Sequence, residues 1–400
     1  MQYFIGLLLV MASLHYGGDY IHFQWFIGAS ILATPIALLG YIFYRRGKGR
    51  TVAIVYPAIA YLIVNATYIS TFRHNRFSAN TVDIKSYFAY LADDHIFYTM
   101  LLFIGVYLYS ILSDPKHILR ALGWWGLVNS IYTIDGYIRG YGLLPMGVGY
   151  SGFINYASVN SSLIAVTLPF WPWAKTRHKF IKDLVLLIVA IIAIYLSKSS
   201  IPIGTMLVVF FFYKVCDHKL SEQVQWSSLR LVAASMALTI IGVILAISRY
   251  FDKTLFDSGY RFHAYKIFMT FWFHKANIFF GFGPGSYLPL AKDIQILNKF
   301  MIHDQGQSFI WLQLHNEWLE LALFNNGLVG LGLALAITAS VTYTFIKHKK
   351  HQELSSFMGL CACSLFNFPL HYFFGAFALT ILIVSAIRLE GDEHELVNMR

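Results

Sequence analysis

The chain is divided into apolar segments, each about as long as a lipid bilayer is thick. Of its 400 residues, 57% are hydrophobic and only 12% are charged, which is about half the charge of an ordinary soluble domain. A helix crosses the hydrocarbon core of a bilayer with about 20 apolar residues. The sequence therefore predicts an all-α, polytopic membrane protein that forms a single integral-membrane domain over residues 1–400.

The apolar segments predict about twelve transmembrane helices. The first, MQYFIGLLLVMASLHYGG, lacks both a basic start and a cleavage site of small residues, so we expect a retained span. The two segments around residues 184–213 are expected to form a tight pair, interrupted at SKSSIP by serines and Pro202. The remaining spans are expected at 22–44, 51–71, 95–113, 119–137, 156–174, 229–249, 327–346, 354–370 and 372–388.

Basic residues collect in the connections that fall on one side of this arrangement. They form RRGKGR at 45–50, KTRHKFIK at 175–182, the run from Lys214 to Lys219, and KHKKHQ at 347–352. By the positive-inside rule this side is the cytoplasm. These runs account for much of the net charge of +10, so the charge does not indicate a nucleic-acid partner.

The longest outer connection, residues 249–316, is predicted to be a large periplasmic loop with an excess of positive charge. One interpretation is that long loops escape the positive-inside rule; the other is an outward-facing anion site. Basic residues of the loop are Arg249, Lys253, Arg261, Lys266, Lys275, Lys292 and Lys299, against Asp252, Asp257, Asp293 and Asp304.

A segment of this loop, YRFHAYKIFMTFWFHKANIFF, has the pattern of a helix lying on the membrane surface. We expect His263, Lys266, Thr270 and His274 on one side of it and Phe262, Tyr265, Met269, Trp272 and Phe273 on the other. Arg261 is expected at the helix start, beside a DSG turn. There its planar guanidinium suits a bidentate contact with phosphate.

The glycine-rich stretch GFGPGSY at 281–287 follows this segment. It lacks the lysine and the strand-before, helix-after context of a nucleotide-binding loop. We expect a tight turn that brings the chain back toward the membrane, with backbone N–H groups available to an anion.

A polar cluster, LHNEWLE, follows at the point where the loop re-enters the membrane. ATP is absent on the outer face, so an enzyme there needs an activated substrate, and bacteria supply glycans outside the cytoplasm on undecaprenyl diphosphate. The departing diphosphate needs arginine or lysine, and the attacking hydroxyl needs a base, which suits a histidine. No metal-ligand signature is present, so we expect a metal-independent reaction without a cofactor.

The pairing of an arginine before GFGPGSY with LHNEWLELALFNNGLVGLG resembles the O-antigen ligase and O-antigen polymerase superfamily. The likeness extends from about Tyr150 to the end of the chain and includes His315-Asn316 followed by Gly327-x-x-Gly330. The resemblance implies a multi-span fold, a large periplasmic loop, a catalytic His315 and a catalytic Arg261. Asn316 and Glu317 would contact substrate beside them.

Two positions depart from the family pattern. The chain has Tyr150 in GYSGFIN where many relatives have an arginine, and Ser200 in LSKSSIP where they have Ser-Arg. We expect Arg139 and Lys198 to replace those arginines, with Lys266 as a further basic residue at the site. His371, in the outer turn FPLHYFFG, and Glu320 are additional candidates.

The resemblance implies a glycosyltransferase of the bacterial inner membrane whose active site faces the periplasm. The first expectation is an O-antigen ligase that transfers glycan from undecaprenyl diphosphate to lipid A–core. The alternatives are a polymerase that extends the growing lipid-linked glycan, a ligase that glycosylates protein, and a non-enzymatic flippase for the polyprenyl diphosphate lipid. Few charges at mid-span and no internal repeat disfavour an ion-coupled transporter.

Overall fold

The computed structural model is almost entirely helical in the residues it describes. The one exception is a short antiparallel hairpin of β1 (Ile302–Asp304) and β2 (Gln307–Phe309). The predicted all-α class is therefore confirmed for this part of the chain. The described residues are 116–140, 150–154, 156–173, 180–217, 255–282, 316–367, 369–371 and 373–398, with 287, 290, 294, 302–304 and 307–309.

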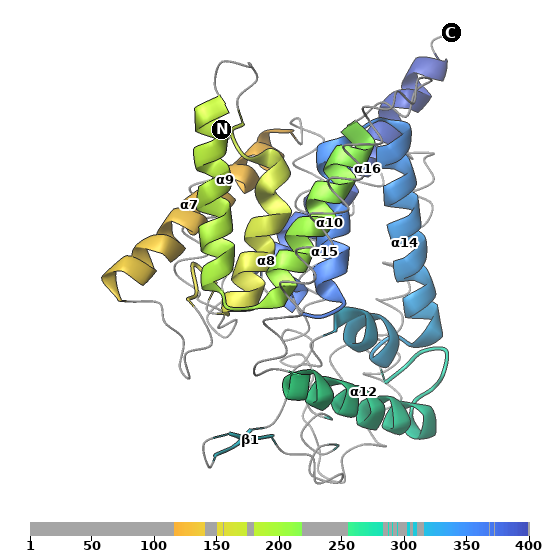
Figure 1. Cartoon of the computed structure of the whole chain (residues 1–400). Coiled ribbons are helices and arrows are strands. Elements are labelled where there is room, and N and C mark those ends of the chain that lie inside the picture. The colour runs from red at the N-terminus through yellow and green to blue at the C-terminus, as the bar shows by residue number, and fades with distance from the viewer. Residues whose placement is uncertain are drawn as a thin grey trace, which may run out of the picture.

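Seven of the predicted spans fall on described residues, and each of them is helical (Figure 1). The other five, at 1–18, 22–44, 51–71, 95–113 and 229–249, lie outside the described residues. The seven correspond to α7 (Lys116–Arg139), α8 (Ala157–Thr167) with the 3-10 turn η4 (Leu168–Phe170), α9 (Phe180–Leu196), α10 (Ser200–Asp217), α14 (Gly327–Lys347), α15 (His351–Ser364) and α16 (Phe373–Asn398).

Among the described helices, α14 alone is both long and apolar enough to cross a membrane. Two further segments, Ala157–Phe170 and Ser200–Tyr213, are apolar but shorter. The count of about twelve transmembrane helices therefore stays a prediction.

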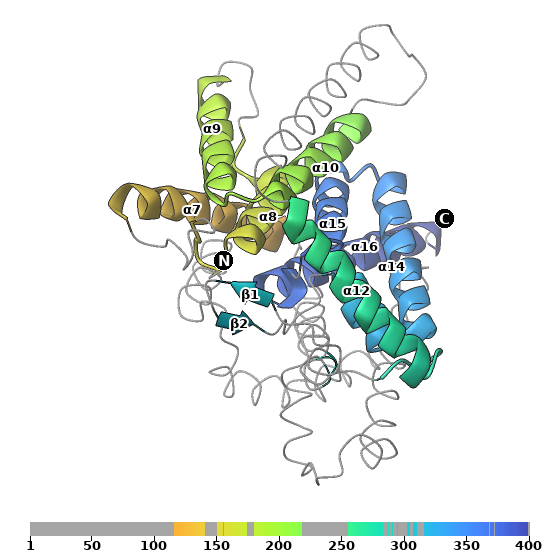
Figure 2. The ribbon, with the colours of Figure 1, turned by 60° about the horizontal axis from the view of Figure 1, so that its bottom comes forward.

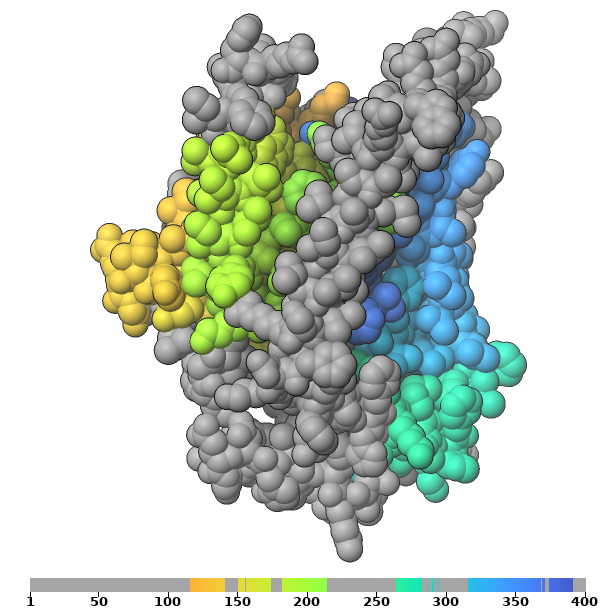
Figure 3. All heavy atoms as spheres, viewed as in Figure 1, coloured from red at the N-terminus to blue at the C-terminus, as the bar shows by residue number. Residues whose placement is uncertain are grey.

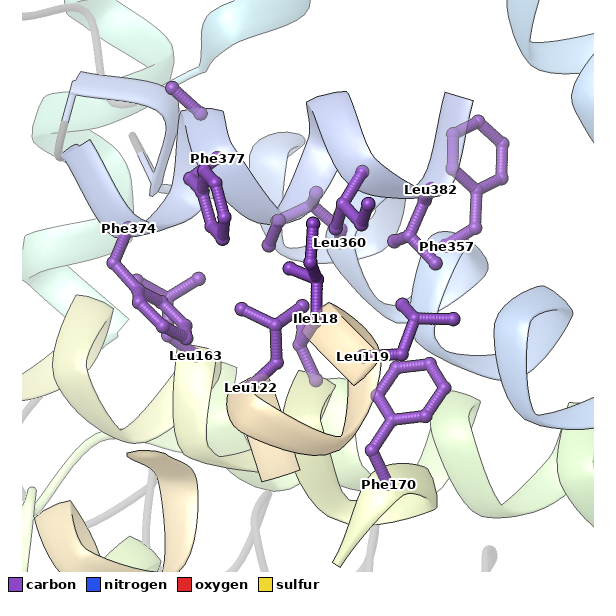
Figure 4. Packing of buried hydrophobic residues seen from close by; sticks show 14 of the residues in the cluster. Ile118, Leu119, Leu122, Leu163, Phe170, Phe357, Leu360, Phe374, Phe377 and Leu382 are labelled. Atoms are coloured by element: carbon purple, nitrogen blue, oxygen red, sulfur yellow. The ribbon is translucent and has the colours of Figure 1, made fainter. Parts of the chain in front are cut away.

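Large apolar side chains from α7, α8, α15 and α16 meet in one core (Figure 4). The rings of Trp125 on α7 and Phe374 on α16 stack with centroids 3.4 Å apart. Burying such a side chain stabilises the folded state by roughly 1.5–3 kcal/mol. This core therefore holds together helices that are far apart in the sequence. Its labelled members are Ile118, Leu119, Leu122, Leu163, Phe170, Phe357, Leu360, Phe374, Phe377 and Leu382.

The break between α9 and α10 lies where the sequence predicts it. Lys198 adopts a left-handed conformation with φ of 52°, and Pro202 stands in the first turn of α10, where its missing N–H costs no helical hydrogen bond. The predicted tight pairing of these helices is wrong, however. Helix α10 packs chiefly on α15 and α8, whereas α9 packs on α7 and α8. Val209 of α10 fits against Gly359 of α15, where no side chain holds the helices apart.

Helix α12 (Leu255–Lys275) lies across one end of the helical bundle, at the bottom of Figure 1. Figure 2, with this end turned forward, shows α12 crossing in front of the start of α14. The basic turn that contains Lys349 and joins α14 to α15 lies at the other end. This arrangement is the one expected if α12 and the basic turn face opposite sides of a membrane.

Several helices present apolar side chains outward rather than to the core. On α14 the exposed residues include Leu328, Leu335 and Ile346, which share one side of the helix. Figure 3 shows the surfaces of α9 and α14 from outside. Apolar helix faces turned outward are typical of contact with lipid or with another protein. The exposed apolar residues of α9 and α7 include Leu184, Ile188, Ile191 and Tyr195, and Trp124, Val128 and Ile131.

Candidate functional site at one end of the bundle

The glycine-rich turn and the start of α14, which the sequence pairs only as motifs, are in direct contact. The backbone N–H of Phe282 donates to the carbonyl of Phe324 at 3.0 Å. The N–H groups of Leu328 and Val329 donate to the carbonyls of Ile278 and Phe279 at 2.9 and 3.2 Å. These contacts bring residues 278–282 back to the start of α14, as a tight turn would, while residues 283–286 of the predicted turn lie outside the described residues.

Two glycines make this approach possible. Gly281 and Gly327 both have φ of 66°, a left-handed conformation that other residues adopt only at a cost. A Cβ at Gly281 would lie 2.6 Å from the carbonyl oxygen of Phe324, and one at Gly327 would collide with the backbone of Phe279. The two motifs therefore need glycine at both positions.

Asn316 fixes the start of the helical segment that leads to α14. Its side-chain oxygen accepts a hydrogen bond from the N–H of Leu319 at 3.1 Å, and its carbonyl accepts one from Glu320 at 2.9 Å. The segment that follows, η6 (Trp318–Phe324), is a π-helix in which the N–H of Asn325 reaches the carbonyl of Glu320 at 3.0 Å. Such single turns of π-helix occur often at functional sites.

Glu317 ties this segment to the connection between α15 and α16. Its side chain is 3% exposed, and its Oε1 accepts a hydrogen bond from the backbone N–H of Leu370. Leu370 belongs to the 3-10 turn η7 (Pro369–His371). Trp318 adds a second link, because its indole N–H donates to the carbonyl of Cys361 on α15 at 3.3 Å.

The α15–α16 connection is joined in turn to the bundle. Asn367 donates from Nδ2 to the hydroxyl of Ser158 on α8 at 3.0 Å, and this hydroxyl lies 3.0 Å from that of Ser199. Ser199 stands between α9 and α10, next to Lys198. Hydrogen bonds therefore link Ser199 through Ser158 to Asn367, and Glu317 to Leu370, both within the α15–α16 connection.

Three buried polar side chains hold residues 150–154 against α7 and α8. Asn129 accepts from the N–H of Phe153 at 2.9 Å, and Asn160 accepts from that of Ile154 at 3.2 Å. The two amides also bond to each other at 2.9 Å, and Asn160 donates to Thr133 at 3.4 Å. Because a buried amide without a partner is costly, this cluster specifies how the segment is folded.

Tyr150 lies beside the ends of α7 and α9. Its N–H donates to the carbonyl of Leu196 at 3.0 Å, and its ring contacts that of Tyr137 at a centroid distance of 5.1 Å. Arg139 and Lys198, the basic residues expected to compensate for Tyr150 and Ser200, each stand two residues beyond one of these contacts. The backbone of this region thus brings the two replacement positions toward the same end of the bundle.

The two expected replacements differ in their surroundings. Arg139 is exposed and bonded through Nε to Asp135, one turn earlier in α7, at 2.8 Å. An exposed pair of this kind contributes little to stability, but it partly compensates the charge of Arg139. Lys198 is exposed at the turn between α9 and α10.

Helix α12 differs from its predicted form in three respects. It begins at Leu255, so Asp257, Ser258 and Gly259 are helical and Arg261 lies in the second turn rather than at the start. An aspartate in a first helical turn is favoured by the helix dipole, which explains the earlier beginning. The helix ends at Lys275, and residues 277–281 form a turn closed by the bridge between Asn277 and Gly281.

The aromatic side of α12 packs on protein rather than among lipid headgroups. Phe268 and Trp272 are buried with Phe282 and Phe324, and burial raises the pKa of Tyr287 in the same cluster well above its usual value, so its hydroxyl stays protonated. Lys266, Thr270 and His274 are exposed, as predicted. Phe273, predicted on the same side as Trp272, is 65% exposed.

The structure thus brings some predicted site residues together and leaves others without a described side chain. Asn316, Glu317 and the backbone of His371 are joined through η6 and η7, whereas Lys266 lies on the exposed side of α12. His315 lies outside the described residues, and of Arg261 and His371 the structure describes the backbone alone. Among the residues that it does describe, no group of three potential metal ligands occurs.

Sequence reasoning missed Ser158, Ser199 and Asn367, which join α8, the α9–α10 turn and the α15–α16 turn. Their signal is weak, because each is a small polar residue at the edge of an apolar segment. It also missed the amide pair of Asn129 and Asn160. Two asparagines within predicted spans are a stronger signal, since an amide inside a membrane domain needs a partner.

Comparison with known proteins adds no named relative. No protein-family model matches the chain, and no curated protein matches it.

Proposed function

We propose that the chain is a membrane glycosyltransferase that moves a glycan from undecaprenyl diphosphate to an acceptor hydroxyl on the periplasmic face. The observation that carries the proposal is the contact between the two motifs of the superfamily resemblance. Backbone hydrogen bonds join residues 278–282 to residues 324–329, and the hydrogen bond from Leu370 to Glu317 joins the start of LHNEW to η7. A catalytic site built from the two motifs requires that they lie next to each other in the fold.

In the proposed reaction the acceptor oxygen attacks the anomeric carbon of the donor glycan. A new C–O bond forms, the bond from that carbon to the diphosphate breaks, and undecaprenyl diphosphate leaves with the electron pair. His315 accepts the hydroxyl proton, and Arg261 stabilises the charge that develops on the leaving diphosphate. Lys198 and Lys266, both exposed, supply further positive charge. Asn316 acts as a positioning residue, because its side chain caps η6 directly after His315.

Burial of Glu317 and Glu320 supports a structural role for both carboxylates. Each is 3% exposed, and Glu317 accepts a hydrogen bond from the backbone of η7. A glutamate that acted as the general base would need access to the acceptor hydroxyl. This leaves the histidine of the cluster as the proposed base.

Covalent transfer by purified protein tests the proposal. The protein is reconstituted in lipid nanodiscs with an undecaprenyl-diphosphate-linked glycan and lipid A–core, and the products are separated by gel electrophoresis and mass spectrometry. The proposal predicts a glycan–lipid A–core product and free undecaprenyl diphosphate. Movement of the lipid-linked glycan across a liposome membrane without any covalent product would indicate a flippase instead.

The first choice within this class is the O-antigen ligase, with the polymerase as the alternative. A deletion strain separates them by its lipopolysaccharide banding. Loss of the whole O-antigen ladder with accumulation of lipid-linked polymer indicates a ligase. Core carrying a single repeat unit indicates a polymerase, and a normal ladder with unglycosylated protein indicates a ligase that acts on protein.

A further inference from the structure

Four large apolar side chains stand exposed at the end of α12 and in the turn that follows it. The exposed fractions of Phe273, Ile278, Phe279 and Phe280 are 65, 46, 61 and 43%. We call these four residues the apolar ridge. Trp272, directly before Phe273, is 1% exposed, and Phe268 is fully buried, so the aromatic residues of this region fall into a buried set and an exposed set.

The ridge is held in place by a structured turn. The side-chain oxygen of Asn277 accepts hydrogen bonds from the N–H groups of Phe279 and Phe280 at 3.0 and 3.2 Å. The carbonyl of Asn277 accepts a third from Gly281 at 2.7 Å. Leaving a phenylalanine in water instead of burying it forgoes roughly 1.5–3 kcal/mol, so a fixed turn that displays two of them favours an apolar partner.

The position of the ridge indicates which partner this is. The carbonyls of Ile278 and Phe279 bond to the N–H groups of Leu328 and Val329, in the first turn of α14. Helix α14 is, within the described part of the chain, the one helix that meets the length and hydropathy expected of a membrane span. The ridge therefore stands at the level where that helix would enter the bilayer.

The exposed apolar surface continues from the ridge along α14. Leu328 is 47% exposed, and Leu335, about two turns further on, is 52% exposed. Figure 3 shows the surface of α12 adjoining that of α14 at the lower right. Lys266 and Thr270, seven and three residues before Phe273 on the same exposed side of α12, are polar, so this side of the helix changes from polar to apolar toward its C-terminal end.

We propose that the apolar ridge inserts into the outer leaflet of the membrane and anchors α12 and the glycine-rich turn at the lipid surface. Insertion of apolar side chains to the boundary between headgroups and acyl chains is the usual mode of interfacial anchoring. Lys275, exposed at the last position of α12, has a side chain long enough for its amine to reach the headgroup phosphates. The inference rests on the membrane placement of α14 and not on the chemistry of transfer.

Site-directed spin labelling tests this anchor. Single cysteines replace Phe279, Thr270 and Leu335 in a chain whose Cys216, Cys361 and Cys363 are changed to alanine, and a nitroxide is attached to each in liposomes. Collision of the label with oxygen, which concentrates in lipid, is compared with collision with a water-soluble nickel complex. Phe280→Cys repeats the measurement if Phe279→Cys does not give a monodisperse protein.

The anchor predicts that labels at 279 and 335 collide more with oxygen, and that the label at 270 collides more with nickel. A label at 279 that behaves like the one at 270, while 335 remains in lipid, overturns the anchor alone. A label at 279 shielded from both reagents also overturns it, because a protein surface then covers the ridge. If the label at 335 is itself in water, the membrane placement of α14 fails with it.

Discussion

The carboxylate of Glu317 accepts a hydrogen bond from the backbone N–H of Leu370, 53 residues further along the chain. This contact joins the residue two positions after His315 to the residue directly before His371. Two segments that carry proposed site residues are thereby held together by one buried acceptor.

We predict that Glu317→Ala destabilises the protein by about 1–3 kcal/mol, because the N–H of Leu370 loses its acceptor. Glu317→Gln, which keeps an oxygen at the same place, should recover most of this loss. Thermal unfolding in detergent measures the effect. Equal stability of the alanine variant and the unmodified protein would show that the contact does not hold the two segments together.

The prediction of this region from the sequence had a physical limit. The apolar runs correctly predicted the seven helices that fall on described residues, because hydropathy is a local property of the sequence. The partner of Glu317 is set by how α15 and α16 pack on η6, and no local pattern records that. The sequence suggested a dipole-favoured glutamate at a helix start and did not indicate a link between segments.

The predictions on α12 and α10 were wrong for different reasons. Phe273, expected on the side of Trp272, lies seven residues after Lys266 and therefore two turns along the same exposed side of the helix. Sequence adjacency suggested that α10 pairs with α9, whereas the absence of a side chain at Gly359 lets α10 pack against α15. The turn that ends at Gly281 was predicted correctly, because a cluster of glycines is itself a local signal for a turn.

Gly327→Ala should destabilise the protein by at least about 1–2 kcal/mol, since Gly327 is left-handed and a Cβ there meets the backbone of Phe279. Gly332→Ala is the matched control. It lies five residues later in the same helix with no atom within 4 Å of the added carbon, so alanine should be neutral or stabilising by up to about 1 kcal/mol. Equal unfolding temperatures for the two variants would contradict the described contact between the turn and α14.

Lys198 has a left-handed backbone that costs a lysine free energy, and its substitution by glycine tests whether its charge is needed for transfer. Lys198→Gly should raise stability by about 1 kcal/mol, because glycine accepts the left-handed backbone without cost, yet lower transfer if the charge contacts the diphosphate. Lys349→Gly is the control, since Lys349 is also left-handed and lies at the other end of the bundle. Its stability should rise with transfer unchanged. Unchanged transfer in both variants would remove Lys198 from the site.

Arg261→Ala should lower glycan transfer at least about tenfold, which corresponds to roughly 1.4 kcal/mol of transition-state stabilisation. Arg261→Lys should recover part of it, because lysine keeps the charge but loses the planar fork of donors. Lys266→Ala, on the exposed side of the same helix, should have the smaller effect. Full transfer by the alanine variant would assign the leaving group to another basic residue.

The central claim is that His315 removes the proton of the attacking hydroxyl, and glycan transfer per molecule of membrane-inserted protein tests it most directly. General-base assistance is worth about a hundred- to ten-thousandfold, so His315→Ala should lower the rate by that factor with normal amounts of protein in the membrane. His274→Ala, which removes an exposed histidine from α12, should leave the rate unchanged. A well-inserted His315→Ala protein that transfers glycan at nearly the unmodified rate would contradict the account and leave LHNEW as a helix start at the membrane surface.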